Sequence, residues 1–323
     1  MKNYNWAVLG TGVIANETAA AMRKNGRTLY AVGNRTYEKA VAFAEKYDIP
    51  KVYDDFNDMF TDDNVDIIYI TTPHNTHIDF MKKAIENGKH ILVEKSITLN
   101  SKELDESISL AEKNNVVLAE AMTVYHMPIY KELNRILLSG ELGKVNLITV
   151  NFGSFKPYDM NNRFFNRSLA GGAMLDIGVY ALSLVRWFFE TKPDDILSQV
   201  KFAPTNVDEQ ASLLLKNSQG QMASVMLSLH SKQPKRAMIS CEKGYIEIME
   251  FPRGWKAGIT DAETGEQRIV DAGKHEDALW YEIEDMEKSV SGENCMHLDY
   301  TKDVMDLMSE FRKSWNMIYP EEE

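Results

Sequence analysis

The sequence contains few cysteines and no cluster of metal-binding side chains. Its two cysteines, Cys241 and Cys295, stand far apart and at no spacing that metal ligands use. So few cysteines exclude a disulfide framework and are typical of a reducing cytoplasm, where we expect the protein to reside. His74 and His77 form a close pair of histidines, but no further ligand follows them at a suitable spacing. We therefore expect no metal site.

Long apolar runs and clusters of positive charge are also missing. No stretch approaches the ~18–20 consecutive apolar residues of a membrane span, and the residues before Trp6 lack the apolar region of a signal peptide. The net charge is −12, and no group of Lys and Arg could follow a phosphate backbone, so we expect neither nucleic acid nor membrane as a partner. The 323 residues, 44% apolar and 26% charged, suit a globular protein of two domains.

A glycine-rich turn follows the first apolar run of the chain, in the order Gly10-Thr11-Gly12-Val13-Ile14-Ala15. Gly10 permits a tight turn, Gly12 lets the backbone approach phosphate groups, and Ala15 keeps the following helix close to the sheet. The free N–H groups and the dipole at the start of that helix attract an anion. Because the motif joins a predicted strand to a predicted helix, it predicts a dinucleotide site at Gly10, Thr11, Gly12, Val13 and Ile14.

The end of the second predicted strand, Thr28–Gly33, bears on the choice of cofactor. Asn34-Arg35-Thr36 follows about 20 residues after the glycine turn, where the residue that contacts the adenosine ribose belongs. An Asp or Glu there would accept both ribose hydroxyls of NAD and repel a 2′-phosphate, but the chain has neither. Because Arg35 suits phosphate and Asn34 is neutral, we predict NADP(H) as the cofactor. In the alternative, NAD(H), Thr36 only caps the helix Glu38–Tyr47 and Arg35 is a solvated surface residue.

Two further predicted strands end in polar residues at the same sheet edge. Val65–Ile70 leads into residues 71–77, and His90–Val93 leads into Glu94-Lys95-Ser96. Ligands of open α/β sheets bind at the carboxyl ends of strands. Lys95 could hydrogen-bond a substrate oxygen there, or it could pair with Glu94 at the surface. We predict that the cofactor contacts Thr71, Thr72, Pro73, Asn75, His77, Glu94 and Lys95.

The order of predicted elements divides the chain into two domains. Strands and helices alternate over residues 4–121, which predicts a doubly wound parallel sheet of the Rossmann type. Residues 196–270 form a run of strands, which indicates an α+β domain with a mostly antiparallel sheet. We therefore assign residues 1–122 to NAD(P) binding and 123–323 to substrate binding and oligomerisation. Val225 and Leu227 alternate with Met222 and Met226, so both sheet faces are apolar, which predicts a homodimer or a dimer of dimers.

An aspartate and a tyrosine stand within an otherwise apolar predicted helix that follows Gly171-Gly172. Asp176 and Tyr180 are four residues apart and so share one face of it. A buried carboxylate is costly unless it is paired, and Lys95 is the obvious partner if the second domain packs over the sheet edge. Alternatively, the local backbone satisfies Asp176 and Tyr180 packs half in the core.

These motifs together resemble those of the Gfo/Idh/MocA family of oxidoreductases. The resemblance extends over nearly the whole chain and is nearest to the branch of NADP-dependent dihydrodiol and D-xylose dehydrogenases, on Glu120-Ala121-Met122 and residues 169–180. It implies that Lys95 contacts both nicotinamide ribose and substrate, that Asp176 orients the reacting group, and that Tyr180 is the catalytic acid/base. Arg163 falls where many relatives carry Trp-Arg near the active site, and we include it among the cofactor contacts.

The chain departs from the family pattern at two positions. Ser96 replaces the proline of the usual Glu-Lys-Pro motif. If relatives hold that proline in a cis peptide bond, the Lys95–Ser96 bond is either also cis or is trans, and a trans bond would move Lys95 slightly. Tyr180 stands where many relatives have His, and a tyrosine of ordinary pKa is a poor base near neutral pH unless Lys95 lowers that pKa.

The resemblance implies an NADP(H)-dependent oxidoreductase. It would transfer hydride between nicotinamide and a CH–OH carbon of a sugar, a polyol or a dihydrodiol-like small molecule. The alternatives are a nicotinamide-dependent glycosidase on the same scaffold and a non-catalytic regulator that senses the cofactor.

Overall fold

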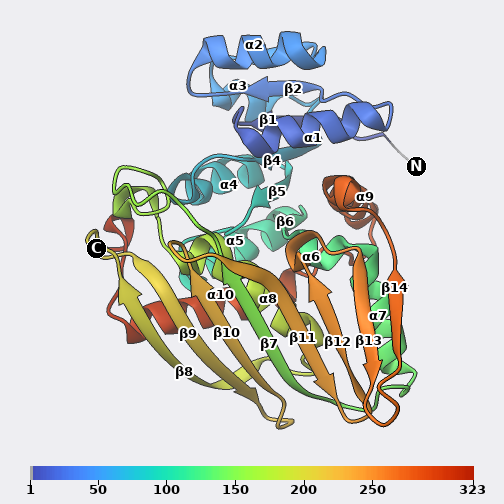
Figure 1. The fold of residues 1–323 in the computed structure, drawn as a ribbon. Helices are drawn as coiled ribbons and strands as arrows, with labels where there is room; N and C mark the ends of the chain where they lie inside the picture. Colours follow the sequence, from blue (N-terminus) through green and yellow to red (C-terminus); the bar gives the residue numbers. More distant parts are fainter. Residues whose placement is uncertain (1–2) are drawn as a thin grey trace. The chain divides into compact units, whose positions relative to one another are not determined.

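The computed structural model describes residues 3–323, which divide into two compact units (Figure 1). The N-terminal unit contains the chain up to Ala121 together with Leu279–Leu298, and the C-terminal unit contains the remainder. The first boundary lies one residue from the predicted one. The return of Leu279–Leu298 to the N-terminal unit corrects the simple division at residue 122.

The helix responsible for this correction is α9 (Ala278–Val290). Its Ile283 and Met286 are buried in the same core as Trp6 of the first strand. The indole N–H of Trp6 also donates to Glu287 Oε1 at 2.8 Å. The amphipathic pattern of α9 predicts a helix with one buried face, but not which domain core receives that face.

The N-terminal unit contains a six-stranded sheet that is parallel throughout. Its strands are β1 (Trp6–Leu9), β2 (Ala31–Gly33), β3 (Lys51–Tyr53), β4 (Ile67–Ile70), β5 (His90–Glu94) and β6 (Leu118–Ala121). They lie in the order β3-β2-β1-β4-β5-β6, which is the Rossmann order with its switch point between β1 and β4. This confirms the predicted fold. The strand β3 was not predicted, because a three-residue edge strand is too short to show a period.

Helices connect the strands of this sheet. They are α1 (Val13–Lys24), α2 (Tyr37–Tyr47), α3 (Phe56–Thr61), α4 (His77–Glu86) and α5 (Ser101–Asn114). The buried residues of α1, α2 and α9 share one core with the strands, and α4 packs against both α3 and α5. This arrangement is doubly wound, and it leaves the carboxyl ends of the strands to the loops.

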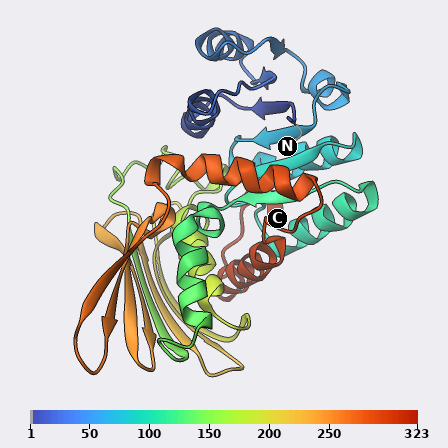
Figure 2. The same cartoon turned by 90° about the vertical axis from the view of Figure 1, so that its right-hand side faces the viewer.

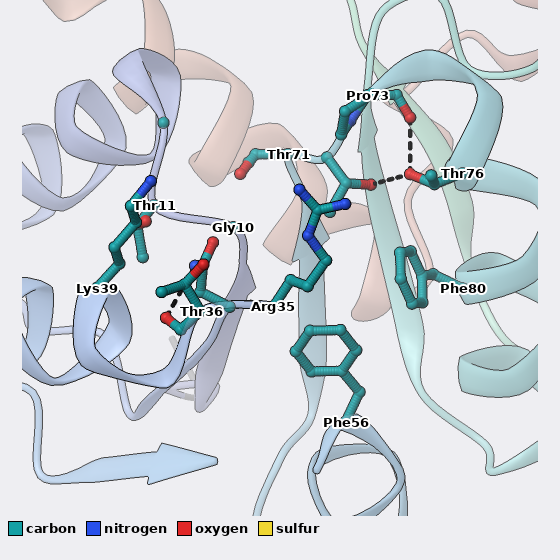
Figure 3. Close-up of a pocket in the computed structure, with 13 residues that line it drawn as sticks. Gly10, Thr11, Arg35, Thr36, Lys39, Phe56, Thr71, Pro73, Thr76 and Phe80 are labelled. Carbon is teal, nitrogen blue, oxygen red and sulfur yellow. Dashed lines mark hydrogen bonds between the residues drawn. The ribbon is translucent and has the colours of Figure 1, made fainter. Parts of the chain in front are cut away.

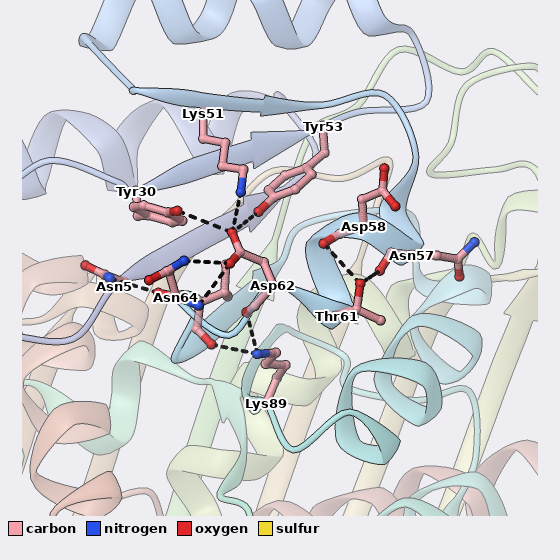
Figure 4. Close-up of polar contacts among 11 residues, drawn as sticks. Asn5, Tyr30, Lys51, Tyr53, Asn57, Asp58, Thr61, Asp62, Asn64 and Lys89 are labelled. Atoms are coloured by element: carbon pink, nitrogen blue, oxygen red, sulfur yellow. Dashed lines mark hydrogen bonds and ion pairs between the residues drawn. The ribbon is translucent and has the colours of Figure 1, made fainter.

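A group of polar side chains around Asp62 ties β3 to neighbouring segments of the N-terminal unit (Figure 4). The Asp62 carboxylate accepts hydrogen bonds from Lys51 Nζ at 2.6 Å, from Tyr30 at 3.3 Å and from the hydroxyl of Tyr53. Lys89 Nζ donates to the backbone oxygen of Asp62 at 2.6 Å. Burial opposes ionisation of Asp62, but the bonds from Lys51 and Tyr53 outweigh it and hold the pKa of this carboxyl well below its usual range.

The C-terminal unit contains an eight-stranded sheet in the order β14-β13-β12-β11-β7-β10-β9-β8. Its strands are β7 (Val145–Gly153), β8 (Pro193–Phe202), β9 (Asp208–Asn217), β10 (Met222–Ser228), β11 (Gln233–Cys241), β12 (Gly244–Met249), β13 (Lys256–Asp261) and β14 (Gln267–Asp271). All neighbours are antiparallel except β7 and β10, which run parallel. The mostly antiparallel sheet confirms the prediction, although β13 was not predicted as a separate strand.

Helices of this unit cover one face of the sheet, as Figures 1 and 2 show. They are α6 (Thr123–His126), α7 (Pro128–Leu138), α8 (Val179–Phe188) and α10 (Leu298–Ser314). Val225 and Leu227 of β10 are buried, whereas Met222 and Met226 are 49% and 43% exposed. The alternation along β10 therefore assigns its two side-chain sets to opposite faces, as expected.

The predicted helix that follows Gly171-Gly172 is not a single regular helix. It starts with a π-helical segment, η3 (Met174–Gly178), and continues as α8. Among the described residues, the stretch Arg167–Phe188 is long and apolar enough to span a bilayer by composition, but 83% of its most apolar window is buried inside the protein. It is therefore a core helix of the C-terminal unit, packed onto the sheet through Gly178, where a Cβ would lie 2.9 Å from Leu227 Cδ1.

Candidate active site

The N-terminal unit contains a cavity of about 430 Å³ beside the glycine turn (Figure 3). The residues lining it follow β1, β2 and β4 or begin the adjoining helices. They are Gly10, Thr11, Gly12, Asn34, Arg35, Thr36, Lys39, Phe56, Thr71, Thr72, Pro73, Thr76 and Phe80. Eight predicted cofactor contacts thus come together at this cavity. The other predicted contacts do not line it, namely Val13, Ile14, Asn75, His77, Glu94, Lys95 and Arg163.

The glycine turn has the shape that a pyrophosphate requires. Gly10 has φ +108°, and a Cβ there would lie 2.6 Å from Thr71 Oγ1. A Cβ at Gly12 would meet no atom within 4 Å, so the space above this residue is open. Within residues 3–323, no side chain caps the start of α1 at Gly12, and its first turn contains no acid. The helix start is therefore available to an anion, and the turn fits a dinucleotide.

Two cations line the part of the cavity beyond β2. Arg35 and Lys39 are both exposed, and the structure gives neither an ion pair within residues 3–323. Figure 3 shows both side chains extending along the cavity. The amide of Asn34 closes the turn by donating to Thr36 O at 3.0 Å. Lys39 was not among the predicted cofactor contacts, although its place one helical turn after Thr36 could have indicated it.

The remaining walls of the cavity come from aromatic rings and from the loop after β4. Phe56 and Phe80 are in edge-to-face contact, with ring centroids 5.4 Å apart. The hydroxyl of Thr76 donates to Thr72 Oγ1 at 2.8 Å or to Pro73 O at 2.7 Å, and these hydrogen bonds fix the conformation of the loop (Figure 3). The cavity thus combines an apolar wall with polar loop ends, as ligand sites commonly do.

Buried polar side chains hold the segment that carries Lys95. The Lys95–Ser96 peptide bond is cis. His74 Nε2 lies 3.0 Å from Lys95 O, and His77 Nδ1 lies 3.1 Å from Ser96 O. Glu120 accepts a hydrogen bond from the N–H of the next residue, Ile97, at 3.0 Å. The backbone around Lys95 is therefore fixed from several sides.

The imidazole of His77 faces the protein interior and not the cavity. It is fully buried, and its second nitrogen, Nε2, lies 2.8 Å from Thr72 O. Burial lowers the pKa of His77, although its backbone partners favour the charged form. His77 therefore links the loop after β4 to the Lys95 segment. Glu94 is held in turn by a hydrogen bond from the hydroxyl of Tyr69 on β4.

In the C-terminal unit, Asp176 lies in η3 and Tyr180 in the first turn of α8. Asp176 is only 8% exposed, and Arg163 Nη2 lies 3.7 Å from its Oδ1. Tyr180 is half-buried, and its ring centroid is 6.3 Å from that of Phe152 on β7. The C-terminal unit thus places a cation of its own, Arg163, near Asp176, and the pairing of Asp176 with Lys95 stays a prediction.

The turn before η3 explains why the sequence has two adjacent glycines. A Cβ on Gly171 would lie 2.7 Å from Arg163 O. Gly172 has φ +126°, and its N–H donates to Phe164 O at 3.0 Å. The loop that carries Arg163 is therefore packed directly onto the start of the segment that carries Asp176.

The predicted catalytic residues come from different units. Lys95 belongs to the N-terminal unit, and Asp176 and Tyr180 belong to the C-terminal unit. That the three meet beside the nicotinamide stays a prediction.

Comparison with known proteins assigns both units. The model of an oxidoreductase family with an NAD-binding Rossmann fold matches residues 4–122, and that of the GFO/IDH/MocA C-terminal domain matches residues 130–247. The chain is 32% identical over 250 residues to trans-1,2-dihydrobenzene-1,2-diol dehydrogenase of Xenopus laevis, covering 76% of this chain and 75% of the relative. It is 29% identical over 252 residues to the Mus musculus enzyme, covering 76% and 74%.

Solved structures share the fold over almost the whole chain. A 3-ketoreductase from Actinomadura kijaniata, in complex with NADP and TDP-benzene, superimposes with a TM-score of 0.86 at 19% identity, covering 97% of this chain and 98% of that one. UDP-N-acetylglucosamine 3-dehydrogenase from Acidithiobacillus ferrooxidans gives 0.83 at 22% identity, with the same coverage. With the glycine turn, the cavity and both matched domains in place, the chain belongs to the Gfo/Idh/MocA family and is an NAD(P)-dependent oxidoreductase acting on CH–OH groups.

Proposed function

We propose that the protein is an NADP(H)-dependent dehydrogenase or reductase that acts on a sugar, a polyol or a dihydrodiol-like small molecule. The observation that carries the cofactor choice is the pair of cations, Arg35 and Lys39, in a cavity whose lining among residues 3–323 contains no acid. The substrate class is supported by the similarity to dihydrodiol dehydrogenases and by the fold shared with enzymes of sugar nucleotides.

Acidic residues outnumber basic ones in this chain, with 48 Asp and Glu against 36 Lys and Arg and a net charge of −12. Two cations without an ion pair within residues 3–323 keep their charge available for a ligand. A guanidinium and an ammonium group along one wall suit a 2′-phosphate, which offers several acceptor oxygens. We expect NADP(H) to bind at least tenfold more tightly than NAD(H), a difference of about 1.4 kcal/mol or more.

The catalytic roles follow from the chemistry of the side chains. When bound, the nicotinamide accepts or supplies the hydride. Tyr180 takes the proton from the substrate hydroxyl or returns it, and the charge of Lys95 makes a tyrosinate accessible near neutral pH. Asp176, nearly buried beside Arg163, fixes the orientation of the reacting group.

The test is a spectrophotometric assay at 340 nm with NADP⁺ and NAD⁺ on a panel of sugars, polyols and cyclic diols. Net formation of NADPH with one of these substrates supports the proposal. Cleavage of a glycoside without net change of cofactor would indicate the glycosidase instead. Cofactor binding without turnover over the whole panel would indicate a regulator.

We also propose that the protein forms a homodimer or a dimer of dimers through the open face of the eight-stranded sheet. The exposed apolar residues on this face are Leu147, Leu197, Leu214, Met222, Met226, Met249 and Ile269. They come from six of the eight strands and share one face by register. Apolar side chains gathered in this way are typical of a protein interface.

Light scattering at micromolar concentration tests the assembly. The wild type should have twice or four times the mass of one chain, and the double variant Leu214→Glu, Met226→Glu should be smaller. Leu138→Glu is the matched control, because Leu138 is 88% exposed but lies on α7 and not on the sheet. A monomeric wild type would contradict the proposal.

A further inference from the structure

Asp208 is a buried carboxyl group to which the proposed reaction assigns no direct role. It stands at the start of β9 and is 0% exposed. Its Oδ2 accepts a hydrogen bond from the backbone N–H of Met174 at 2.6 Å. Its Oδ1 has no hydrogen-bond partner among residues 3–323. Burial of an ionisable group with one unsatisfied oxygen is costly, so this position requires a reason.

The carboxyl group packs against the glycine pair that precedes η3. A Cβ on Gly172 would come within 2.1 Å of Asp208 Oδ1, so this carboxyl occupies the space that a side chain would need. The carbonyl of Gly171 accepts a hydrogen bond from the hydroxyl of Tyr319 at 2.7 Å. The turn is thus held on one side by Asp208 and on another by Tyr319.

This contact acts on the start of the segment that carries the proposed catalytic side chains. The first N–H groups of a helix lack partners within the helix and bear partial positive charge, so a carboxylate that accepts from them fixes where the helix begins. Met174 opens η3, two residues before Asp176. Tyr180 follows in the same continuous stretch. A shift of the first turn would therefore move both side chains.

We propose that Asp208 is a positioning residue whose carboxylate, through the N–H of Met174, holds Asp176 and Tyr180 in the arrangement that proton transfer requires. The inference rests on the proposed function. Asp208 is fully buried, and the contact through which it acts is its hydrogen bond to the N–H of Met174. It also accounts for Gly172, since any larger residue would displace the carboxylate.

The surroundings of Asp208 make this contact sensitive to pH. Burial raises the pKa of Asp208 to about 7, although backbone N–H groups and Arg312 favour its charged form. A carboxylate accepts a stronger hydrogen bond than a carboxylic acid does, so the contact with Met174 should tighten as the pH rises through neutrality. Of the charged and titratable groups near this carboxyl, Arg312 favours its charged form and Tyr319 interacts with it. Glu321 and Glu322 act on Tyr319, and Glu322 also pairs with Arg312.

The test compares the wild type with Asp208→Asn, which keeps the shape and one acceptor but cannot ionise. In TROSY NMR spectra, the amide proton of Met174 should move downfield with a midpoint near pH 7 in the wild type and should not titrate in the variant. With a substrate from the cofactor assay, kcat of the variant at pH 8 should fall about ten- to hundredfold. The loss should be smaller at pH 6, and the affinity for NADP(H) should not change.

Asp303→Asn is the matched control for general destabilisation. Asp303 accepts from Arg186 Nε at 2.7 Å near the other end of α8, so its replacement should lower thermal stability but leave the Met174 titration and the pH profile of kcat unchanged. If Asp208→Asn does not fold, Gly172→Ala serves instead, because its Cβ would push the carboxylate away. Gly220→Ala then controls for backbone strain, since Gly220 has φ +82° and nothing within 4 Å.

Two results would overturn the proposal. One is a Met174 amide that does not titrate in the wild type. The other is Asp208→Asn with the kcat and pH profile of the wild type. If no substrate is turned over, the proposed function fails while the NMR titration still decides whether Asp208 holds the helix start.

Discussion

The cofactor cavity of the N-terminal unit and the helical segment of the C-terminal unit use charged side chains in opposite ways. In the cavity, Arg35 and Lys39 are exposed and have no ion pair within residues 3–323. In the helical segment, Asp176 is nearly buried beside Arg163, and a second buried carboxyl, Asp208, holds the turn before it. The cavity keeps its charges available for a ligand, whereas the segment fixes its polar groups before any ligand arrives.

This difference predicts that substitutions in the two regions separate affinity from rate. Exposed cations attract a charged ligand but contribute the same to its binding in the ground state and in the transition state. Groups preorganised around the reacting atoms contribute mainly to the transition state. Variants of the cavity should therefore change cofactor affinity, and variants of the segment should change kcat.

The largest effect is expected at Tyr180. Tyr180→Phe keeps the ring beside Phe152 and removes only the hydroxyl, so kcat should fall about 10²–10⁴-fold, the loss expected of a general acid/base. The affinity for NADP(H), measured by fluorescence titration, should hardly change. Tyr125→Phe is a suitable control, since Tyr125 is a fully buried tyrosine of the same unit. Normal turnover by Tyr180→Phe would contradict the acid/base role and leave Tyr180 with a packing role only.

Lys95→Met should lower kcat at least as much, because it removes the charge that makes a tyrosine usable near neutral pH. Any kinetic pKa assigned to Tyr180 should rise in this variant, which a pH profile of kcat measures. Asp176→Asn should have a smaller effect, because its proposed role is orientation. If Lys95→Met were inactive while Tyr180→Phe turned over normally, the lysine alone would handle the proton.

An effect of intermediate size is expected in the cavity. Arg35→Ala and Lys39→Ala should each weaken NADP(H) binding about tenfold, as loss of a charge-assisted contact does, and leave NAD(H) binding and kcat nearly unchanged. Isothermal titration with both cofactors measures this selectivity. Lys46→Ala is a matched control on the same helix, outside the cavity lining. Equal losses of affinity for NADP(H) and NAD(H) would show that Arg35 and Lys39 do not bind the 2′-phosphate.

The smallest effect concerns stability. Its dependence on pH should have opposite signs for one carboxyl group of each unit, Asp62 and Asp208. The pKa of Asp62 is depressed in the folded state. Its contribution to the free energy of unfolding is therefore present above the unfolded pKa of about 3.9 and is lost as the pH falls below that value. Asp62→Asn should lower the free energy of unfolding by about 1–2 kcal/mol at pH 7. The neighbouring Asp63→Asn, on an exposed side chain, should have little effect.

Asp208 should behave in the opposite way. Its folded pKa of about 7 lies above the unfolded value, so the folded state binds more protons between about pH 4 and pH 7, and stability falls as the pH rises through this range. Asp208→Asn should remove this slope. Urea unfolding at several pH values measures how the free energy of unfolding depends on pH in the wild type and in both variants. If Asp62 and Asp208 contributed slopes of the same sign, the comparison would be contradicted.

Much of the fold could be predicted because its signals are local. The glycine turn, the buried parallel strands and the alternation along β10 show in runs of a few residues, whose periods differ between strand and helix. The strands β3 and β13 escaped prediction for the same reason. β3 has three residues, and β13 has six with a glycine, Gly258, among them, so both depend on pairing with neighbours that sequence periodicity does not show.

The residues of the candidate site also divide into those with a local signal in the sequence and those without one. Arg35, Lys95, Asp176 and Tyr180 were identified because charged or polar residues stand out at strand ends and within an apolar helix. Asp208 gave no such signal, because it precedes an ordinary strand and its partner, Met174, is 34 residues away. Burial, which raises its pKa, is a property of the packed unit and not of the neighbouring residues.

The sequence alone determined the class of fold, the place of the dinucleotide turn and the residues that could carry the chemistry, because each depends on neighbours within a helical turn or a strand. The tertiary structure decided which core receives α9, where His77 points, what stands beside Asp176 and what holds the start of η3. These depend on contacts between segments far apart in the chain, which form only when the two cores exclude water and pack.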